Sequence, residues 1–398
     1  METCKHFGTC GGCTYLDIPY NDELSQKDHI LRETLAPYAH LLEPIIPAPS
    51  PKAYRNKMEL AFGDEGKDGQ LALGIRKRRS FYEVATTEEC ILIPEDFKKI
   101  AKHTQDYFRQ TNEAFFHRKR HTGSLRHLVL RRGEFTGEIL INLSTTSRLE
   151  ADLAPLVTQL LALPLDGKIT GILHSINDGV SDTVKDENIH ILWGRDYFHE
   201  RICGLDFKVT AFSFFQTNSA GAETLYGVIS DMAQESASEK DSAPVNASQS
   251  NPRLAYDLYC GTGTIAQVLS PSFEKVVGIE LNPDAIKAAK ENATLNNITN
   301  CEFYAGDVLA ILDEGARPTK PDIAVVDPPR NGLHPKALAK LIAISPPTLI
   351  YVACKPESLA RDLGPLTEAG YKPIRAVGVD MFPRTPHVEC VMLLKMQE

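Results

Sequence analysis

Long apolar runs and a secretory signal are both missing from this sequence. No apolar stretch in its 398 residues approaches the roughly 20 residues that a membrane-spanning helix needs. The N-terminus, METCKHFGTCGGC, also lacks the apolar core of a signal peptide. We therefore expect a cytoplasmic protein that spans no membrane, and nothing in the sequence implies a protein partner.

The chain also lacks an excess of positive charge. Its net charge of −9 argues against a nucleic-acid partner. Residues 51–132 are different, because Lys and Arg outnumber Asp and Glu there, with clusters at Arg76–Arg79, His117–His121 and Arg131-Arg132. Such clusters suit contacts with RNA phosphates, but they are equally typical of a solvated basic face.

Nine cysteines are present, and a reducing cytosol makes disulfides between them unexpected. Cys4, Cys10 and Cys13 form the pattern Cys-x5-Cys-x2-Cys, and Cys90 is the candidate fourth ligand. Four thiolates suit either a tetrahedral zinc ion or an iron–sulfur cluster. Ligand type alone leaves both open.

Length and pattern predict three parts. Residues 1–50 form an N-terminal cysteine segment, completed by Cys90, with a helix near Tyr20–Tyr38. Residues 51–200 alternate short strands and turns around a helix at Pro94–Arg109, which predicts a mixed antiparallel α/β domain and candidate RNA-binding domain. Residues 201–398 form the third part, and residues 234–252, without a large apolar side chain, predict a flexible insert.

The third part alternates apolar strands with amphipathic helices, which predicts an α/β fold with a parallel sheet covered on both faces. No helix separates the last two strands, so we expect an antiparallel hairpin at the sheet edge. The predicted strands are Leu254–Tyr259, Val276–Ile279, Glu302–Tyr304, Ile323–Val326, Thr348–Val352, Ile374–Val379 and Val388–Leu394.

A glycine-rich turn follows the first of these strands and predicts a nucleoside site. Gly261 and Gly263 permit positive φ and close approach of a ligand to the backbone. Glu280, after the next strand, can accept hydrogen bonds from ribose hydroxyls, and Asp307 is placed to meet an adenine edge. NAD, S-adenosylmethionine and an unoccupied glycine turn are all compatible with this pattern.

The following strand favours a methyl donor over NAD. Asp327-Pro328-Pro329-Arg330 lies at its carboxyl end, where open α/β sheets bind ligands. Two prolines make a rigid, acid-bearing lip that suits a planar base beside a methyl donor. The alternative is a proline-rich turn without a ligand.

Cys354 ends the next strand and precedes a helix that starts at Pro356. A helix N-terminus carries partial positive charge, so we expect a lowered thiol pKa and a nucleophilic thiolate, although a lone cysteine also serves simple packing. A thiolate that attacks C6 of uracil makes C5 nucleophilic toward a methyl group. The C5 proton then needs a base, and Glu389, with a pKa raised by apolar neighbours, is the candidate. A strand-end surface charge is the alternative for Glu389.

Five motifs occur together and in order: FFQTN at 214–218, DLYCGTGT at 257–264, DPPR at 327–330, CKPESLARD at 354–362 and HVE at 387–389. With them the chain resembles the RNA uracil-5-methyltransferase family, and within it the iron–sulfur 23S rRNA enzymes, over nearly its whole length. The resemblance implies a class I, Rossmann-like methyltransferase domain. It implies Cys354 as nucleophile, Glu389 as base, and S-adenosylmethionine contacts from Gln216, Tyr259, Gly261, Gly263, Thr264, Glu280, Asp307 and Asp327.

Two positions depart from the family pattern. Lys355 stands where the family usually has Asn after the cysteine, which affects the tuning of the thiol, and Thr264 replaces a common Asn, which weakens the case for its contact. The resemblance also implies a 4Fe–4S cluster on Cys4, Cys10, Cys13 and Cys90, and 23S rRNA as substrate, with tRNA as the alternative. The N-terminal β-barrel of fuller family members is expected to be missing. A NAD-dependent oxidoreductase and a non-catalytic RNA-binding protein remain as other classes.

Overall fold

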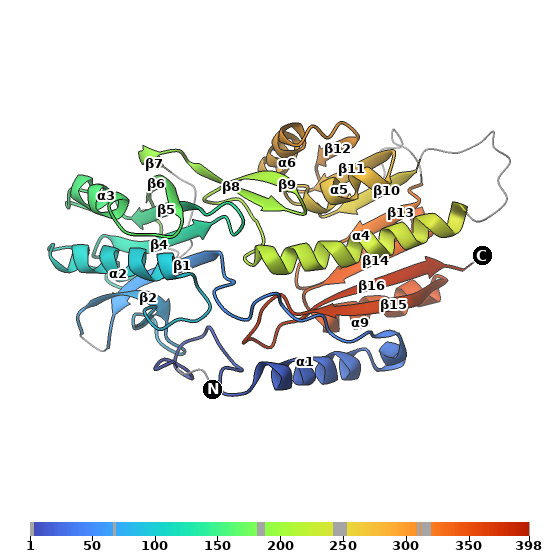
Figure 1. Ribbon diagram of the computed structural model, residues 1–398, viewed down its shortest axis with the longest axis horizontal. Helices are drawn as coiled ribbons and strands as arrows, with labels where there is room; N and C mark the ends of the chain where they lie inside the picture. Colours follow the sequence, from blue (N-terminus) through green and yellow to red (C-terminus); the bar gives the residue numbers. More distant parts are fainter. Residues whose placement is uncertain are drawn as a thin grey trace. The chain divides into compact units, whose positions relative to one another are not determined.

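The computed structural model describes residues 4–66, 69–180, 188–241, 253–308, 311 and 320–397, without the side chains of residues 237–241. They form two compact units, shown in Figure 1. The first comprises Met1–Tyr20, Ser50–Arg201 and Lys208–Ser219, and the second comprises Asn21–Pro49, Ile202–Phe207 and Ala220–Glu398. The predicted segment 1–50 is thus shared between the two units.

The described residues of the first unit contain a seven-stranded sheet in the order β3-β2-β1-β4-β5-β6-β7. Neighbouring strands are antiparallel except β5 and β6, which are parallel, so the sheet is of the mixed type that the sequence predicts. Helix α2 packs against β2 and α3. The elements are β1 Lys57–Asp64, β2 Leu71–Arg76, β3 Val84–Thr86, α2 Glu95–Arg109, β4 Leu125–Arg132, β5 Glu138–Thr145, α3 Ala154–Leu161, β6 Lys168–Ile176 and β7 Ile189–Gly194. The two-stranded sheet of β8 Tyr197–Ile202 and β9 Leu205–Thr210 follows, and its residues are divided between the two units.

The sheet of the second unit has the order β12-β11-β10-β13-β14-β16-β15 in the described residues. The first five strands are parallel, and β16 is antiparallel to both β14 and β15, so the predicted edge hairpin is confirmed. The elements are α1 Tyr20–Thr34, η1 Ala36–Leu41, α4 Ser219–Asp241, β10 Leu254–Leu258, α5 Thr264–Leu269, η2 Ser270–Ser272, β11 Lys275–Glu280, α6 Pro283–Leu295, β12 Cys301–Ala305, β13 Ile323–Val326, α8 Pro335–Ile344, β14 Thr348–Ala353, α9 Pro356–Glu368, β15 Tyr371–Val379 and β16 Glu389–Met396.

The central strands β10, β13 and β14 are buried along their whole length. Parallel strands with helices on both faces are expected to consist of continuous apolar residues. Most residues of these three strands are apolar. The order of the strands reverses between β10 and β13, with β11 on one side of β10 and β13 on the other. Ligands of open α/β sheets bind at the carboxyl ends of the strands beside such a reversal.

Two predicted segments differ in the structure. The N-terminal helix ends at Thr34 rather than Tyr38, and the 3-10 helix η1 follows, with Pro37 near its start. The predicted insert at 234–252 is helical up to Asp241 as part of α4, and residues 242–252 lie outside the described residues. The helix continues there because Ser236 is buried and Glu235 forms an ion pair of 2.9 Å with Arg375.

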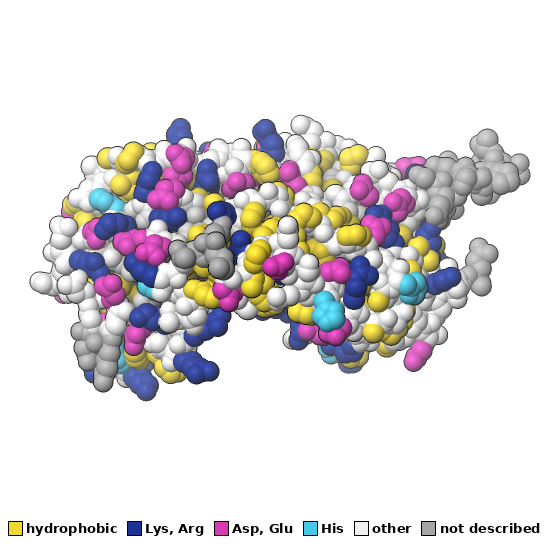
Figure 2. Space-filling view, turned by 60° about the horizontal axis from the view of Figure 1, so that its bottom comes forward, with side chains coloured by type: hydrophobic (Ala, Val, Ile, Leu, Met, Phe, Trp, Pro, Cys, Tyr) yellow, Lys and Arg dark blue, Asp and Glu magenta, His cyan; other side chains and the backbone are white. Residues whose placement is uncertain are grey.

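One arginine of the predicted basic clusters in the first unit is buried. Figure 2 shows Lys and Arg side chains interspersed with Asp and Glu on the face in view. Arg131 is 3% exposed and donates to the carbonyl oxygens of Ser213, at 2.8 Å, and Thr210, and burial lowers its pKa to about 10. The predicted phosphate contact is therefore wrong for Arg131, because its guanidinium is used inside the fold.

Other members of these clusters lie beside aromatic rings. Tyr82 and His117 stack with their ring centroids 4.3 Å apart, and Phe81 is 67% exposed. Arg78 Nη2 donates to the carbonyl oxygen of Cys13 at 3.2 Å, so the loop that carries Arg78 and Phe81 lies beside the cysteine segment.

Among the described residues, no helix has the length and apolar character that crossing a membrane requires.

Candidate active site

The glycine turn after β10 has the backbone that the sequence predicts. Gly261 has φ +52° and Gly263 has φ +76°. A Cβ at Gly263 would lie 2.6 Å from the Phe303 ring and 2.9 Å from Cβ of Ala289, whereas a Cβ at Gly261 would meet nothing within 4 Å. Gly263 therefore lets α5 pack closely, and Gly261 leaves the backbone open to a ligand.

Three predicted cofactor residues converge on this turn. Glu280 ends β11, and its carboxylate accepts hydrogen bonds from the backbone N–H of Gly261, at 3.3 Å, and of Asn282, at 2.9 Å. Burial raises the pKa of Tyr259, and the negative charges of Asp307 and Glu280 raise it further. Tyr259, Glu280 and Asp307 thus form one acidic wall near the carboxyl ends of β10, β11 and β12.

Asp257 stabilises the glycine turn through a hydrogen bond to α5. The motif alone did not reveal this role. Asp257 is fully buried in β10, and its Oδ2 accepts the N–H of Ala266 at 2.8 Å, which ties the first turn of α5 to the strand. Its Oδ1 has no hydrogen-bond partner among the described residues. Burial raises the pKa of Asp257 to about 8, with smaller contributions from Asp327 and Glu280.

The register of the sheet brings the two predicted reacting groups together. In the antiparallel pair of β14 and β16, Ala353 lies opposite Cys390. Cys354 follows Ala353 and Glu389 precedes Cys390, so the two side chains end neighbouring strands at the same edge. Asp327 directly follows β13, the other neighbour of β14. The thiol and both carboxyl groups therefore lie at the carboxyl edge of the parallel strands.

This arrangement changes the predicted ionisation of the thiol. The prediction that the helix N-terminus lowers the Cys354 pKa is wrong, because burial and the charges of Glu389 and Asp327 raise it. Burial raises the pKa of Glu389 to about 8, as the sequence predicts, and that of Asp327 to about 7. Burial is the largest cause for all three groups, and the charge of Asp327 adds to the shifts of both Cys354 and Glu389.

Arg330 partly offsets the rise in the pKa of two of these groups. Its charge lowers the pKa of both Cys354 and Glu389. Its Nη2 lies 3.2 Å from Nε2 and 3.3 Å from Nδ1 of His387, two residues before Glu389. The sequence placed Arg330 in the DPPR motif, but its effect on two groups far away in the chain required the fold.

All of the predicted cofactor contacts remain predictions, including those of Thr264 and Gln216. Thr264 is the first residue of α5 and is 7% exposed. Gln216 belongs to Lys208–Ser219, which is part of the first unit. Its predicted contact with the cofactor therefore stays an expectation.

The four predicted cysteine ligands line one cavity in the first unit. Cys4, Cys10, Cys13 and Cys90 share its wall with apolar side chains such as Ile75 and Leu92. The N–H of Gly12 points at the Cys10 sulfur at 3.3 Å, and backbone N–H groups of Leu92 and Ile93 point at that of Cys90. In the described part of the chain, no three His, Cys, Asp or Glu side chains converge on one point that could hold a single metal ion.

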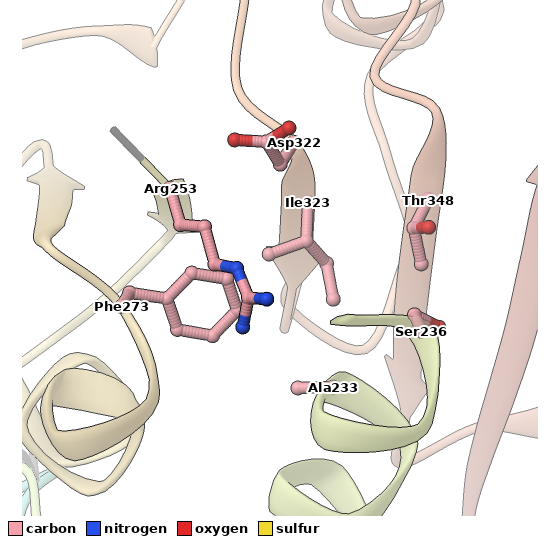
Figure 3. Close-up of a pocket in the computed structure, with 7 residues that line it drawn as sticks. All are labelled: Ala233, Ser236, Arg253, Phe273, Asp322, Ile323 and Thr348. Carbon is pink, nitrogen blue, oxygen red and sulfur yellow. The ribbon is translucent and has the colours of Figure 1, made fainter. Parts of the chain in front are cut away.

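A separate small pocket lies at the opposite edge of the second sheet, drawn in Figure 3. It lies where β10, β13 and β14 begin, so it is remote from the carboxyl edge that carries Cys354. The Asp322 carboxylate there accepts a hydrogen bond from the N–H of Leu254 at 3.0 Å. This bond links it to the start of β10, so the carboxylate has a structural role. The lining residues are Ala233, Ser236, Arg253, Phe273, Asp322, Ile323 and Thr348.

Comparisons with known proteins agree on the chemistry. Residues 255–356 match the family described as "Methyltransferase domain", and residues 320–397 match "tRNA (Uracil-5-)-methyltransferase". An uncharacterized RNA methyltransferase of Clostridium tetani is 43% identical over 99% of this chain and 84% of its own length. Another, of Caldanaerobacter subterraneus, is 42% identical over 98% of this chain and 84% of its own. The Pyrococcus abyssi tRNA (uracil-54, C5)-methyltransferase, solved with S-adenosyl-L-homocysteine, is 28% identical with a TM-score of 0.76, over 97% of this chain and 86% of that one.

Proposed function

Because this chain is an S-adenosylmethionine-dependent RNA methyltransferase and belongs to the RNA uracil-5-methyltransferase family, we propose that it methylates C5 of a specific uridine in 23S rRNA. The product is 5-methyluridine, formed through a covalent bond between Cys354 and C6 of the base. The observation that carries this proposal is the placement of Cys354 and Glu389 at adjacent strand ends, beside Asp327.

The nucleophile is the Cys354 thiolate. Its sulfur forms a bond to C6, and the electrons of the C5=C6 double bond move toward O4, which makes C5 an enolate carbon. The thiol proton leaves first, and Asp327, whose pKa is about 7, can accept it near neutral pH. Arg330 favours the thiolate because its positive charge lowers the Cys354 pKa.

The base is Glu389 in its carboxylate form. After C5 has gained the methyl group, Glu389 takes the C5 proton, the C5=C6 double bond forms again, and the bond from C6 to the Cys354 sulfur breaks. A base with a pKa of about 8 is well matched to proton transfer near neutral pH, because it is partly ionised and still basic. The sulfur leaves as a thiolate and regains the proton held by Asp327, and Glu389 gives its proton to solvent, so the thiol and the base are both restored.

The methyl donor fits the acidic wall beside the glycine turn. Glu280 is placed to accept hydrogen bonds from ribose hydroxyls, Asp307 to meet the adenine edge, and the backbone at Gly261 is open to the ligand. When bound, S-adenosylmethionine supplies the methyl group and carries positive charge, which the buried carboxyl groups of Asp257 and Asp327 favour electrostatically. Gln216, Tyr259, Gly263, Thr264 and Asp327 are proposed to complete the site.

The first unit is proposed to bind the RNA. Phe81 is an exposed aromatic ring close to Arg79, and the stacked pair of Tyr82 and His117 follows. Aromatic faces bind unpaired bases, and neighbouring cations bind phosphates, so this surface suits RNA with unstacked bases. The target uridine must likewise leave its stack to reach the Cys354 sulfur.

Two RNA classes have separate support. The cysteine pattern resembles that of the iron–sulfur 23S rRNA enzymes, which favours 23S rRNA. The Pyrococcus abyssi structure, which is similar over 97% of the chain, is of a tRNA methyltransferase, so tRNA is the second candidate. In both cases the chemistry at Cys354 is the same.

The cysteine cavity is proposed to hold a 4Fe–4S cluster. Its donor set fits, because four thiols line a mainly apolar cavity and backbone N–H groups are directed at two of the sulfurs. In such a cluster each thiolate binds its own iron, so the four sulfurs do not converge on one point, as they would around a single zinc ion. The Arg78 contact with Cys13 suggests that the cluster would stabilise the RNA-binding loop.

One experiment tests the function directly. 5-Methyluridine is mapped in rRNA and tRNA from cells with the protein, without it, and with Cys354→Ala in its place. We expect one or more 23S rRNA positions to lose the methyl group both without the protein and in the variant. Loss confined to tRNA would support the second candidate, and unchanged 5-methyluridine in both RNAs would overturn the proposal.

A further inference from the structure

Four charged side chains form a buried network between helix α1 and the chain after β15. Lys27 Nζ donates to Glu23 at 2.7 Å, to Asp380 at 2.7 Å and to the carbonyl oxygen of Phe382 at 3.2 Å. Glu23 also accepts the backbone N–H of Arg384 at 2.7 Å and lies 3.5 Å from its guanidinium. All four charged residues are at most 6% exposed, and their formal charges cancel.

This network does not resemble ordinary helix packing. The buried residues of α1 are Glu23, Lys27 and Leu31, so two of the three are charged. Burying an ion raises the free energy of the folded state unless the ion is paired. A paired buried network therefore adds little stability, but it favours one defined geometry. Lys27 uses all three of its donors within the network, which permits one arrangement of the residues around it.

The clamped segment leads directly to the proposed base. Asp380 follows Val379, the last residue of β15, and Val379 lies opposite Glu389 in the register of β15 and β16. Figure 1 shows α1, in dark blue, next to the β15 edge of the red part of the sheet, and the bridges of Leu42 to Ala376 and of Ile46 to Val379 continue this contact.

The rest of the loop between β15 and β16 connects the clamp to the reacting edge. Thr385 Oγ1 donates to the carbonyl oxygen of Phe382, which Lys27 also contacts, and accepts the N–H of His387 at 3.3 Å. His387 in turn lies against Arg330. A continuous set of contacts therefore runs from Lys27 along this loop to His387 and Arg330. The charge of Arg330 acts on Glu389.

We propose that Lys27 is a positioning residue for catalysis, which holds the loop 380–388 so that the Glu389 carboxylate faces the C5 proton of the bound base. The inference rests on the proposed function, because it assigns Lys27 a role only in the step that Glu389 performs. Lys27 touches neither substrate nor cofactor in this role. The first attack by Cys354, which lies on β14, does not depend on the clamp.

The decisive variant removes the clamp without leaving a buried charge alone. Lys27→Met with Asp380→Asn deletes one positive and one negative charge and keeps the Glu23–Arg384 pair. Asp380→Asn alone is the second, milder variant, should the double variant fold poorly. Glu43→Gln is the matched control, because it breaks an ion pair of 2.6 Å between the same N-terminal segment and Arg375 of the same strand, farther from Glu389.

Each folded variant is assayed with RNA and S-adenosylmethionine for kcat, KM and protein–RNA adduct on denaturing gels. We expect the double variant to lose about tenfold or more in kcat, to keep its KM for S-adenosylmethionine, and to accumulate adduct, as we also expect of Glu389→Gln. Asp380→Asn should show the same direction, and Glu43→Gln none of it. Unchanged kcat and no adduct in both clamp variants, with only a lower melting temperature, would overturn the inference.

The failure of the proposed function looks different. If Glu389→Gln keeps its kcat and forms no adduct, Glu389 is not the base, and the role of Lys27 falls with it. If Glu389→Gln accumulates adduct and the clamp variants do not, the proposed function stands and the positioning role of Lys27 is rejected.

Discussion

Cys354, which follows the last residue of β14, and Glu389, the first residue of β16, lie at the same edge of the sheet, although α9, β15 and a loop separate the two antiparallel strands in the chain. Burial raises the pKa of both groups, the charge of Glu389 raises that of Cys354 further, and the charge of Asp327 acts on both. In the proposed reaction, the thiol acts first and the carboxylate acts after methyl transfer. The predictions below follow from it.

Replacing the thiol should stop the reaction without unfolding the protein. Cys354→Ala removes a half-buried sulfur at a strand end, so we expect methyl transfer to fall about 10³-fold or more while the affinity for S-adenosylmethionine stays unchanged. Cys203→Ala is the control, because Cys203 is an exposed cysteine in the turn between β8 and β9. Turnover by Cys354→Ala at the rate of this control would reject the covalent route.

Replacing the base should stop the cycle one step later. Glu389→Gln keeps the size of a side chain that is 6% exposed but cannot accept the C5 proton. We expect turnover to fall by about 10²–10⁴-fold and a protein–RNA adduct to persist on denaturing gels, because the bond to Cys354 forms and cannot be released. The double variant Cys354→Ala/Glu389→Gln should give no adduct, and an adduct in it would assign the covalent bond to another residue.

The fold could be predicted from the sequence best where strands are buried on both faces. Ile323–Val326 was predicted and is β13, because a buried parallel strand is a continuous apolar run. The edge strand β15 begins at Tyr371, earlier than predicted. Its first residues alternate between buried and exposed, as Tyr371 and Lys372 do, so they do not form the continuous apolar run that was used to predict strands. The insertion of β16 between β14 and β15 depends on pairing across the sheet, which no local pattern encodes.

The candidate site was predictable in its residues but not in its electrostatics. The motifs identified Cys354, Asp327 and Glu389, but the local helix N-terminus suggested the wrong direction for the thiol pKa. The direction is set by burial and by carboxyl groups from distant parts of the chain. The same limit applies to Lys27, whose partner Asp380 is 353 positions away.

The stability of the protein without cofactor should fall as the pH rises. Burial raises the pKa of Asp257 and Glu389 to about 8 and of Asp327 to about 7 in the folded state, above their ordinary values in the unfolded chain. Their protonated forms stabilise the fold fully below about pH 4, and unfolding releases these protons at higher pH. Each group lowers the free energy of unfolding by about 1.4 kcal/mol per pH unit until the pH passes its folded pKa.

Asp257→Asn isolates one of these groups. Asparagine keeps an acceptor for the N–H of Ala266 and resembles the protonated acid, so it should flatten the pH dependence and stabilise the protein at pH 8 relative to the native chain. Denaturant unfolding at several pH values measures both slopes. An equal slope in the variant would show that Asp257 is ionised in the folded protein.

The cysteine cavity makes a prediction that needs no enzyme assay. Cys90→Ser should give a protein with little visible absorbance and little bound iron, because Cys90 lines the cavity with the three N-terminal cysteines. Cys203→Ser, which changes an exposed cysteine outside the cavity, should keep both. A brown Cys90→Ser protein with unchanged absorbance would exclude Cys90 as a ligand.

Arg330 should set the pH at which the enzyme works. Its charge lowers the pKa of Cys354 and Glu389, and both groups act in their ionised forms, so Arg330→Met should raise both pKa values. The rising limb of the pH–rate profile should therefore move to higher pH, and activity at neutral pH should fall while activity at high pH partly recovers. Lys336→Met, at the exposed start of α8, is the control and should keep the native profile. A loss of activity in Arg330→Met that is equal at every pH would mean that Arg330 contacts the RNA or the base and does not tune the ionisation of Cys354 and Glu389.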